Sequence, residues 1–140
     1  MKILVLHGPN LNLIGLKSSQ TGDRYTLDKI NKKLKQGARD LKIRLKIYQT
    51  HKTYMAISFL QQNRKLYSGI LLAPSSWAKY EYSILETLEI IGLPFVQILL
   101  DQKKEIKNSI FSSKAIYNIY DSNPTEAFLK GLKTIEKHLS

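Results

Sequence analysis

Apolar residues follow two patterns that alternate along the chain. Short runs of buried or alternating apolar residues predict strands, and the segments are 2–6, 44–49, 69–73, 94–100 and 115–120. Between them, apolar residues recur every three or four positions, which predicts helices with one buried face. Those stripes are Leu27 to Leu41, Met55 to Leu60, Ile84 to Ile91 and Phe128 to Leu139.

Two helix starts are marked by their capping residues. Thr26 precedes the first stripe and is placed to cap a helix that begins at Leu27. Asn123, Pro124 and Glu126 combine a cap, a proline at the first position and an acidic residue three positions on. The predicted helices include a continuous one over 80–91, and the polar segment 103–113 is expected to be a loop with some helix.

The alternation of strands and helices predicts an α/β fold in one domain, residues 1–140. Such a doubly wound parallel sheet commonly has the order 2-1-3-4-5. Ligands then bind beyond the carboxyl ends of the strands, where the order reverses between strands 1 and 3. The segments expected at that crevice are 7–25, 74–79 and the residues after Leu100.

Composition and net charge limit the location and the binding partners that we expect for the protein. No apolar run approaches the ~20 residues that span a bilayer, and no secretory signal is recognisable at the N-terminus. The chain has no cysteine, which excludes disulfides and thiolate metal sites and favours a cytoplasmic location. The net charge of +11 favours anionic partners. Because the lysines are scattered and a basic patch is one of several required features, nucleic acid is not the expected partner.

Several polar side chains fall at the predicted crevice. Asn10 and Asn12 follow the first strand and either orient a polar ligand or brace their own turn. Ser75 and Ser76 follow the third strand, where backbone N–H groups at a helix start could bind an anion. The lysines expected to make the crevice electropositive are Lys17, Lys52 and Lys79.

Metal and cofactor chemistry have little support in the sequence. His7 and His51 close the first two strands and could act as acid and base or hold a metal, but no third ligand is placed beside them. The chain has no P-loop, no G-x-G-x-x-G and no G-x-S-x-G motif. We therefore expect no metal and no cofactor.

The opening Gly8-Pro9-Asn10-Leu11-Asn12-Leu13-Ile14-Gly15 resembles that of the type II 3-dehydroquinate dehydratases. The resemblance extends to about residue 102 through matches at Thr26-Leu27, Tyr48-Gln49-Thr50, Pro74 and Leu93-Pro94. It implies a flavodoxin-like fold and a cofactor-free lyase that converts 3-dehydroquinate to 3-dehydroshikimate. It also implies a cyclic acid as ligand and a homo-oligomer, a trimer or a dodecamer built from trimers.

The chain departs from the family pattern at its chemical positions. Lys17 stands for an arginine and Gly22 for the tyrosine base, while Ala73 replaces the asparagine on the enolate side. Lys79 stands for the acid histidine, and Gln97-Ile98-Leu99 stands for the family's Glu-x-His after Pro94. The Ser-Asn pair of the carboxylate site becomes Asp101-Gln102. Losing a single acid–base group costs about 100- to 10,000-fold in rate.

Three functions remain open from the sequence. A rebuilt dehydratase would use Tyr25 as base with Lys17 and Lys79 as its charged partners. A non-catalytic or repurposed member would bind a small anionic ligand in a lysine-lined crevice. A basic nucleic-acid-binding module is the third. The predicted ligand-binding residues are Asn10, Asn12, Ser75, Ser76, Asp101, Gln102 and His51.

Overall fold

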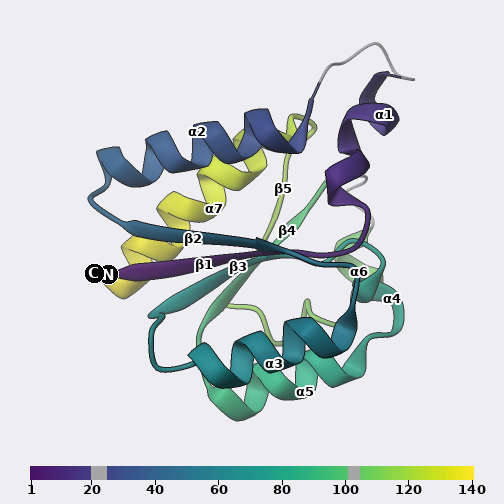
Figure 1. Ribbon diagram of the computed structural model, residues 1–140, viewed down its shortest axis with the longest axis vertical. Coiled ribbons are helices and arrows are strands. Elements are labelled where there is room, and N and C mark those ends of the chain that lie inside the picture. Colours follow the sequence, from purple (N-terminus) through teal and green to yellow (C-terminus); the bar gives the residue numbers. More distant parts are fainter. Residues whose placement is uncertain (20–24, 101–104) are drawn as a thin grey trace.

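Five parallel strands form a sheet in the order β2-β1-β3-β4-β5, as the sequence predicts. The structure is a computed structural model and describes residues 1–19, 25–100 and 105–140 (Figure 1). The strands are β1 (Lys2–His7), β2 (Arg44–Gln49), β3 (Gly69–Ala73), β4 (Phe95–Leu99) and β5 (Tyr117–Tyr120). This is the predicted doubly wound α/β architecture.

Long helices cover both faces of the sheet. In Figure 1, α2 (Leu27–Asp40) and α7 (Pro124–Leu139) lie on one face, and α3 (Thr53–Asn63) and α5 (Tyr82–Ile91) on the other. Short helices gather near the carboxyl ends of the strands, away from the two chain termini (Figure 1). They are η1 (Leu11–Leu13), α1 (Ile14–Ser19), α4 (Trp77–Tyr80) and α6 (Glu105–Asn108).

Both predicted helix caps are confirmed. The Thr26 hydroxyl accepts a hydrogen bond from the Lys29 backbone N–H at 3.2 Å, at the start of α2. The Asn123 side chain accepts one from the Glu126 N–H at 3.3 Å, with Pro124 in the first turn of α7. Each cap satisfies a backbone donor that a helix end leaves unpaired.

The predicted continuous helix over 80–91 is wrong at one residue. Glu81 has φ −87° and ψ 69°, which ends α4 and lets α5 begin at Tyr82. Its carboxylate accepts a hydrogen bond from the Thr53 hydroxyl at 3.1 Å. A contact with a distant helix thus accompanies the break, and helical spacing of apolar residues carries no information about it.

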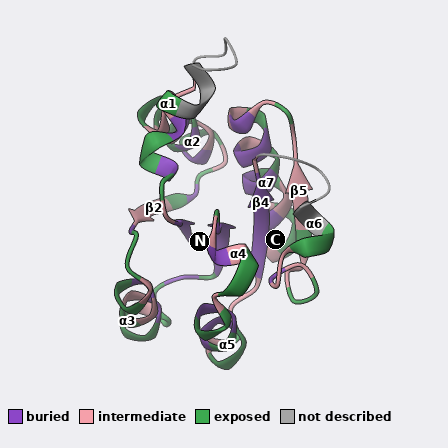
Figure 2. Ribbon diagram, turned by 90° about the vertical axis from the view of Figure 1, so that its right-hand side faces the viewer, coloured by how far each residue is buried: buried purple, intermediate pink, exposed green. Residues whose placement is uncertain are grey.

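Two apolar layers enclose the sheet. Odd-numbered positions of β1, such as Ile3 and Val5, pack against α2 and α7, and the even-numbered Leu4 and Leu6 pack toward α3 and α5. Figure 2 shows buried β4 at the centre and exposed outer surfaces on α3 and α5. None of the helices within the described residues is long and apolar enough to cross a membrane.

Candidate functional site

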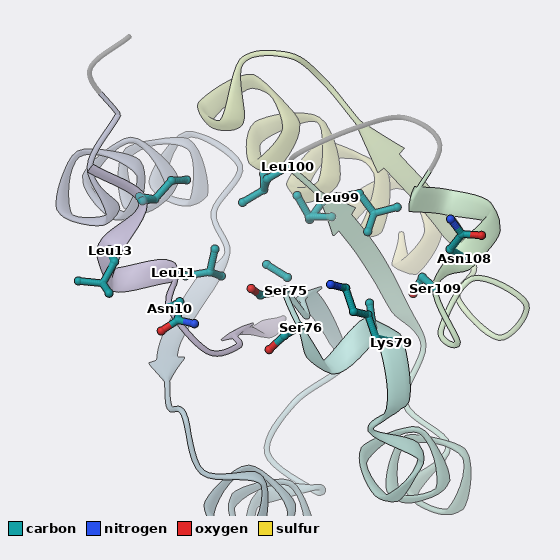
Figure 3. Close-up of a pocket in the computed structure, with 14 residues that line it drawn as sticks. Asn10, Leu11, Leu13, Ser75, Ser76, Lys79, Leu99, Leu100, Asn108 and Ser109 are labelled. Atoms are coloured by element: carbon teal, nitrogen blue, oxygen red, sulfur yellow. The ribbon is translucent and has the colours of Figure 1, made fainter. Parts of the chain in front are cut away.

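A cavity of about 530 Å³ opens at the carboxyl end of the sheet. Its walls come from the segment after β1, the turn after β3, the end of β4 and residues 108–109 (Figure 3). This is the point at which the strand order reverses between β1 and β3, where α/β sheets bind their ligands. The predicted position of the crevice is confirmed.

Gly8 brings the segments after β1 and β3 into direct contact. Its backbone N–H donates to the Ala73 carbonyl at 2.8 Å. A Cβ atom at this position would lie 2.3 Å from the Pro74 carbonyl oxygen, closer than any real contact. Only glycine permits this approach, so the two walls of the cavity are held together at this residue.

Two residues of the cavity wall have left-handed backbone conformations. Asn10 has φ 67° and Ser75 has φ 53°, a region that non-glycine residues occupy at some energetic cost. Such conformations cluster at functional sites, where the surrounding structure compels them. Asn10 and Ser75 sit after β1 and β3, on either side of the Gly8 contact.

The polar part of the wall contains one charged side chain. Among the described residues, six polar ones line the cavity: Asn10, Ser75, Ser76, Lys79, Asn108 and Ser109. Among the described residues of the wall, Lys79 alone carries a charge, and Figure 3 shows its amino group turned toward the hollow. The described part of the wall is therefore electropositive through Lys79.

The rest of the wall is hydrocarbon. Eight apolar residues in the described part of the chain line the cavity: Leu11, Leu13 and Ile14 after β1, Ala73 and Ala78 around the turn after β3, and Ile98, Leu99 and Leu100 at the end of β4. Five of these eight are buried, Ala78 and Leu100 are half-buried, and Leu13 has 46% of its surface exposed. Nothing in the periodic pattern of the sequence predicts that the site is largely apolar.

A buried amide organises the wall segment at 108–112. Gln97 of β4 is fully buried, and its Nε2 donates to the Ser112 hydroxyl at 3.0 Å and to Asn118 Oδ1 at 2.7 Å. Its Oε1 accepts a hydrogen bond from the Ser109 hydroxyl. Sequence reasoning missed this network, and its only signal was a glutamine inside the apolar run PFVQILL.

His7 lies on the face of the sheet that α2 and α7 cover. Its Nε2 lies 3.0 Å from Asn31 Oδ1 of α2, and its ring meets Phe128 of α7 edge-on at 5.2 Å. An amide oxygen can only accept, so Nε2 carries the proton and Nδ1 keeps a lone pair, with no partner among the described residues. Burial lowers the pKa of His7 from 6.5 to about 4, against a smaller opposing effect of the Asn31 bond.

His51 and Asn12, both predicted as ligand-binding residues, lie outside the cavity wall. The exposed His51 accepts a hydrogen bond at Nδ1 from the Asn10 backbone N–H, at 3.2 Å. Asn12 is exposed within η1. His51 thus supports the backbone of Asn10, while His7 contacts α2 and α7, so the two imidazoles engage different elements.

Tyr25 lies at a second hollow rather than at the cavity. It shares a depression of about 430 Å³ with residues of α2 and the start of α7, including Lys29 and Thr125. Lys52 places its amino group 6.0 Å from the centre of the Tyr54 ring and does not line the cavity. The side chain of Lys17, and both Asp101 and Gln102, lie outside the described residues.

The predicted residues that meet at the cavity are Asn10, Ser75, Ser76 and Lys79. Within the described part of the chain, no group of three or more His, Asp or Glu side chains could hold a metal ion. The chemistry available in the described wall is that of amide, hydroxyl and ammonium groups beside hydrocarbon.

The sheet order and the position of the cavity define a flavodoxin-like α/β protein with a cavity at its topological switch point. Crystal structures share this architecture at low sequence identity. A type II dehydroquinase from Butyrivibrio crossotus superposes with a TM-score of 0.82 at 20% identity, over 99% of this chain and 97% of that one. A 3-dehydroquinate dehydratase-like protein from Bifidobacterium longum gives 0.75 at 18% identity, covering 100% and 98%.

Sequence comparison is more specific. The family model of class II dehydroquinases matches residues 1–138. A 3-dehydroquinate dehydratase from Geotalea daltonii is 33% identical over 143 residues, which cover 99% of each protein. One from Halothermothrix orenii is 30% identical over 138 residues, covering 96% of this chain and 93% of the relative. The chain belongs to the type II dehydroquinase family.

Proposed function

We propose that this member of the family binds a small carboxylate-bearing ligand in the cavity and does not dehydrate 3-dehydroquinate efficiently. The observation that carries the proposal is Lys79, the one charged side chain in the described wall. Lys79 is exposed, so its ammonium group can meet a ligand carboxylate at the mouth of the cavity, where solvent screens part of the attraction. The overall charge of +11 favours the approach of the same ligands.

The described wall is poor in groups that transfer protons. Dehydration next to a ketone needs a base for the carbon-bound proton and an acid for the departing hydroxyl. No Tyr, His, Asp or Glu is among the described residues that line the cavity. Tyr25, the candidate base, lies at the second hollow, and Gly22 occupies the matching family position and has no side chain.

The family's own reaction is the second candidate function. It is favoured by the two 3-dehydroquinate dehydratases that are 33% and 30% identical over nearly their whole length. In that case Lys79 would protonate the departing hydroxyl, and a residue outside the described wall would act as the base. This candidate requires turnover that depends on Lys79.

A turnover assay separates the two candidates. Purified protein is incubated with 3-dehydroquinate while the ultraviolet absorbance of the conjugated product is followed. The ligand-binding proposal expects a rate at least about 1,000-fold below that of a dehydratase from the family, as befits loss of both base and acid. A rate within tenfold of that reference would overturn the proposal and establish the second candidate.

Calorimetry tests the anion site directly. Quinate, cyclohexanecarboxylate and the uncharged cyclohexanecarboxamide are titrated into the protein, into Lys79→Met and into the control Lys133→Met. Lys133 is an exposed lysine of α7 away from the cavity wall, so the control makes the same change in net charge. At least one acid should bind, the amide about tenfold more weakly, and only Lys79→Met should abolish the difference. No binding of either acid overturns the proposed function.

A further inference from the structure

Three of the polar side chains of the described cavity wall come from one short turn, and the amides of Asn10 and Asn108 lie apart from it in the sequence. Ser75, Ser76 and Lys79 come from five consecutive positions after β3, and none of their side chains has a hydrogen-bond partner among the described residues. Figure 3 shows Ser75, Ser76 and Lys79 grouped around one part of the hollow. These two hydroxyls and one ammonium can receive a single anionic head group.

The hydroxyl of Ser109, by contrast, already makes hydrogen bonds within the protein. It donates to Gln97 Oε1 and accepts from the Phe111 backbone N–H at 3.2 Å. A ligand hydroxyl at this side of the cavity would have to displace one of those bonds. The segment at 108–109 therefore offers less hydrogen bonding than its residue types imply.

Apart from the amides of Asn10 and Asn108, the rest of the described wall faces the ligand with carbon. Leu11 comes from the segment after β1, while Ile98 and Leu99 end β4, and all three are less than 10% exposed. A hydroxyl placed against such side chains gives up its water and gains no partner, which weakens binding by about tenfold or more. A ring CH₂ group in the same place gains from leaving water.

We propose that the cavity selects a cyclic monocarboxylate with an apolar body over a polyhydroxylated one. The carboxylate lies at Lys79, Ser75 and Ser76, and the ring lies against Leu11, Ile98 and Leu99. This inference rests on the proposed function, because it requires that the cavity bind a carboxylate. It adds that the family's hydroxylated substrate is a poor fit to this chain.

The test compares two acids that share a ring and a carboxylate. Quinate carries hydroxyls on the cyclohexane ring, and cyclohexanecarboxylate carries none. Calorimetric titration should give a dissociation constant for cyclohexanecarboxylate at least about tenfold below that for quinate. Equal or tighter binding of quinate overturns the inference and leaves the proposed function standing, whereas binding of neither acid overturns both.

Substitutions in the cavity wall test which residues cause the preference for cyclohexanecarboxylate over quinate. Leu99→Ser should reduce the ratio of the dissociation constants of quinate and cyclohexanecarboxylate by about tenfold, since it gives a ligand hydroxyl a partner. Leu13→Ser changes an exposed cavity residue at little cost to folding, and should narrow the ratio by about threefold. The matched control is Leu66→Ser, because Leu66 is 55% exposed and away from the cavity, against 46% for Leu13. An unchanged ratio in both cavity variants, with folding verified by circular dichroism, overturns the assignment.

Discussion

The regions around Gln97 and His7 both bury a polar side chain, but they differ in how completely that side chain is hydrogen-bonded. Gln97 lies between β4 and the segment at 109–118, and both its amide oxygen and its amide nitrogen are hydrogen-bonded. His7 lies between β1, α2 and α7 with one ring nitrogen bonded and the other without a partner among the described residues. A buried amide with all its hydrogen bonds made stabilises the fold at any pH, whereas a buried imidazole makes stability depend on its protonation state.

Removing the amide from the first region has the largest expected effect. Gln97→Leu replaces the amide by an apolar side chain of similar size and removes the partner that Ser109, Ser112 and Asn118 share. We expect a loss of about 3–5 kcal/mol in the free energy of unfolding, because three hydrogen bonds to the fully buried Gln97 are lost together. Urea denaturation measures it.

A matched amide provides the control for that substitution. Asn63→Leu removes a half-buried amide of α3 that donates once, to the Phe59 carbonyl at 2.9 Å. Its cost should stay near 1 kcal/mol. If Gln97→Leu costs no more than Asn63→Leu, the network around Gln97 does not stabilise the protein.

The second region predicts a loss of stability in mild acid. The unfolded chain protonates His7 near pH 6.5 and the folded protein only near pH 4, so the unfolded state binds more protons between these values. The free energy of unfolding should therefore fall by about 3 kcal/mol as pH drops from 6.5 to 4. Urea titrations at several pH values measure the slope.

Two histidine variants separate His7 from other titrating groups. His7→Leu should remove most of the slope between pH 6.5 and 4, whereas substitution of the exposed His138 by Gln should retain it. A wild-type slope in His7→Leu would contradict the assignment of this pH dependence to His7.

The smallest change in stability is expected for a substitution of Asn31, the hydrogen-bond partner of His7. Asn31→Ala removes the bond to Nε2, which should cost about 1 kcal/mol in the free energy of unfolding at neutral pH. Because that bond raises the pKa of His7, its loss should move the ring titration, followed by NMR, further below 4. Gln36→Ala, an exposed change in the same helix, corrects for helix propensity. A His7 pKa that rises in Asn31→Ala would show that the bond does not favour the protonated ring.

The strands and caps were predictable because local pattern determines them. The segments 44–49 and 69–73 are strands at the predicted bounds, and Asn123 caps α7 as expected. Each signal lies within a few neighbouring residues. The break at Glu81 was not predictable, because it accompanies a hydrogen bond from Thr53, far away in the chain.

The candidate site was predictable in position but less so in content. The switch point of the sheet placed Asn10, Ser75 and Lys79 together. Tyr25 is also near that end in sequence, yet it lies at the hollow between α2 and α7, because sequence distance does not determine the direction of a side chain. The apolar lining from Leu11, Ile98 and Leu99 looked like ordinary core in the sequence.

Trp77 gives this end of the molecule an optical reporter. It is the only tryptophan of the chain, it is 2% exposed, and it directly follows Ser76 of the cavity wall. A Cβ atom on Gly8 would lie 3.1 Å from its ring, so the indole also senses the junction of the two cavity segments. Its emission therefore reports the local environment at the edge where the two loops meet, and an occupied cavity should change its wavelength or intensity without any added dye.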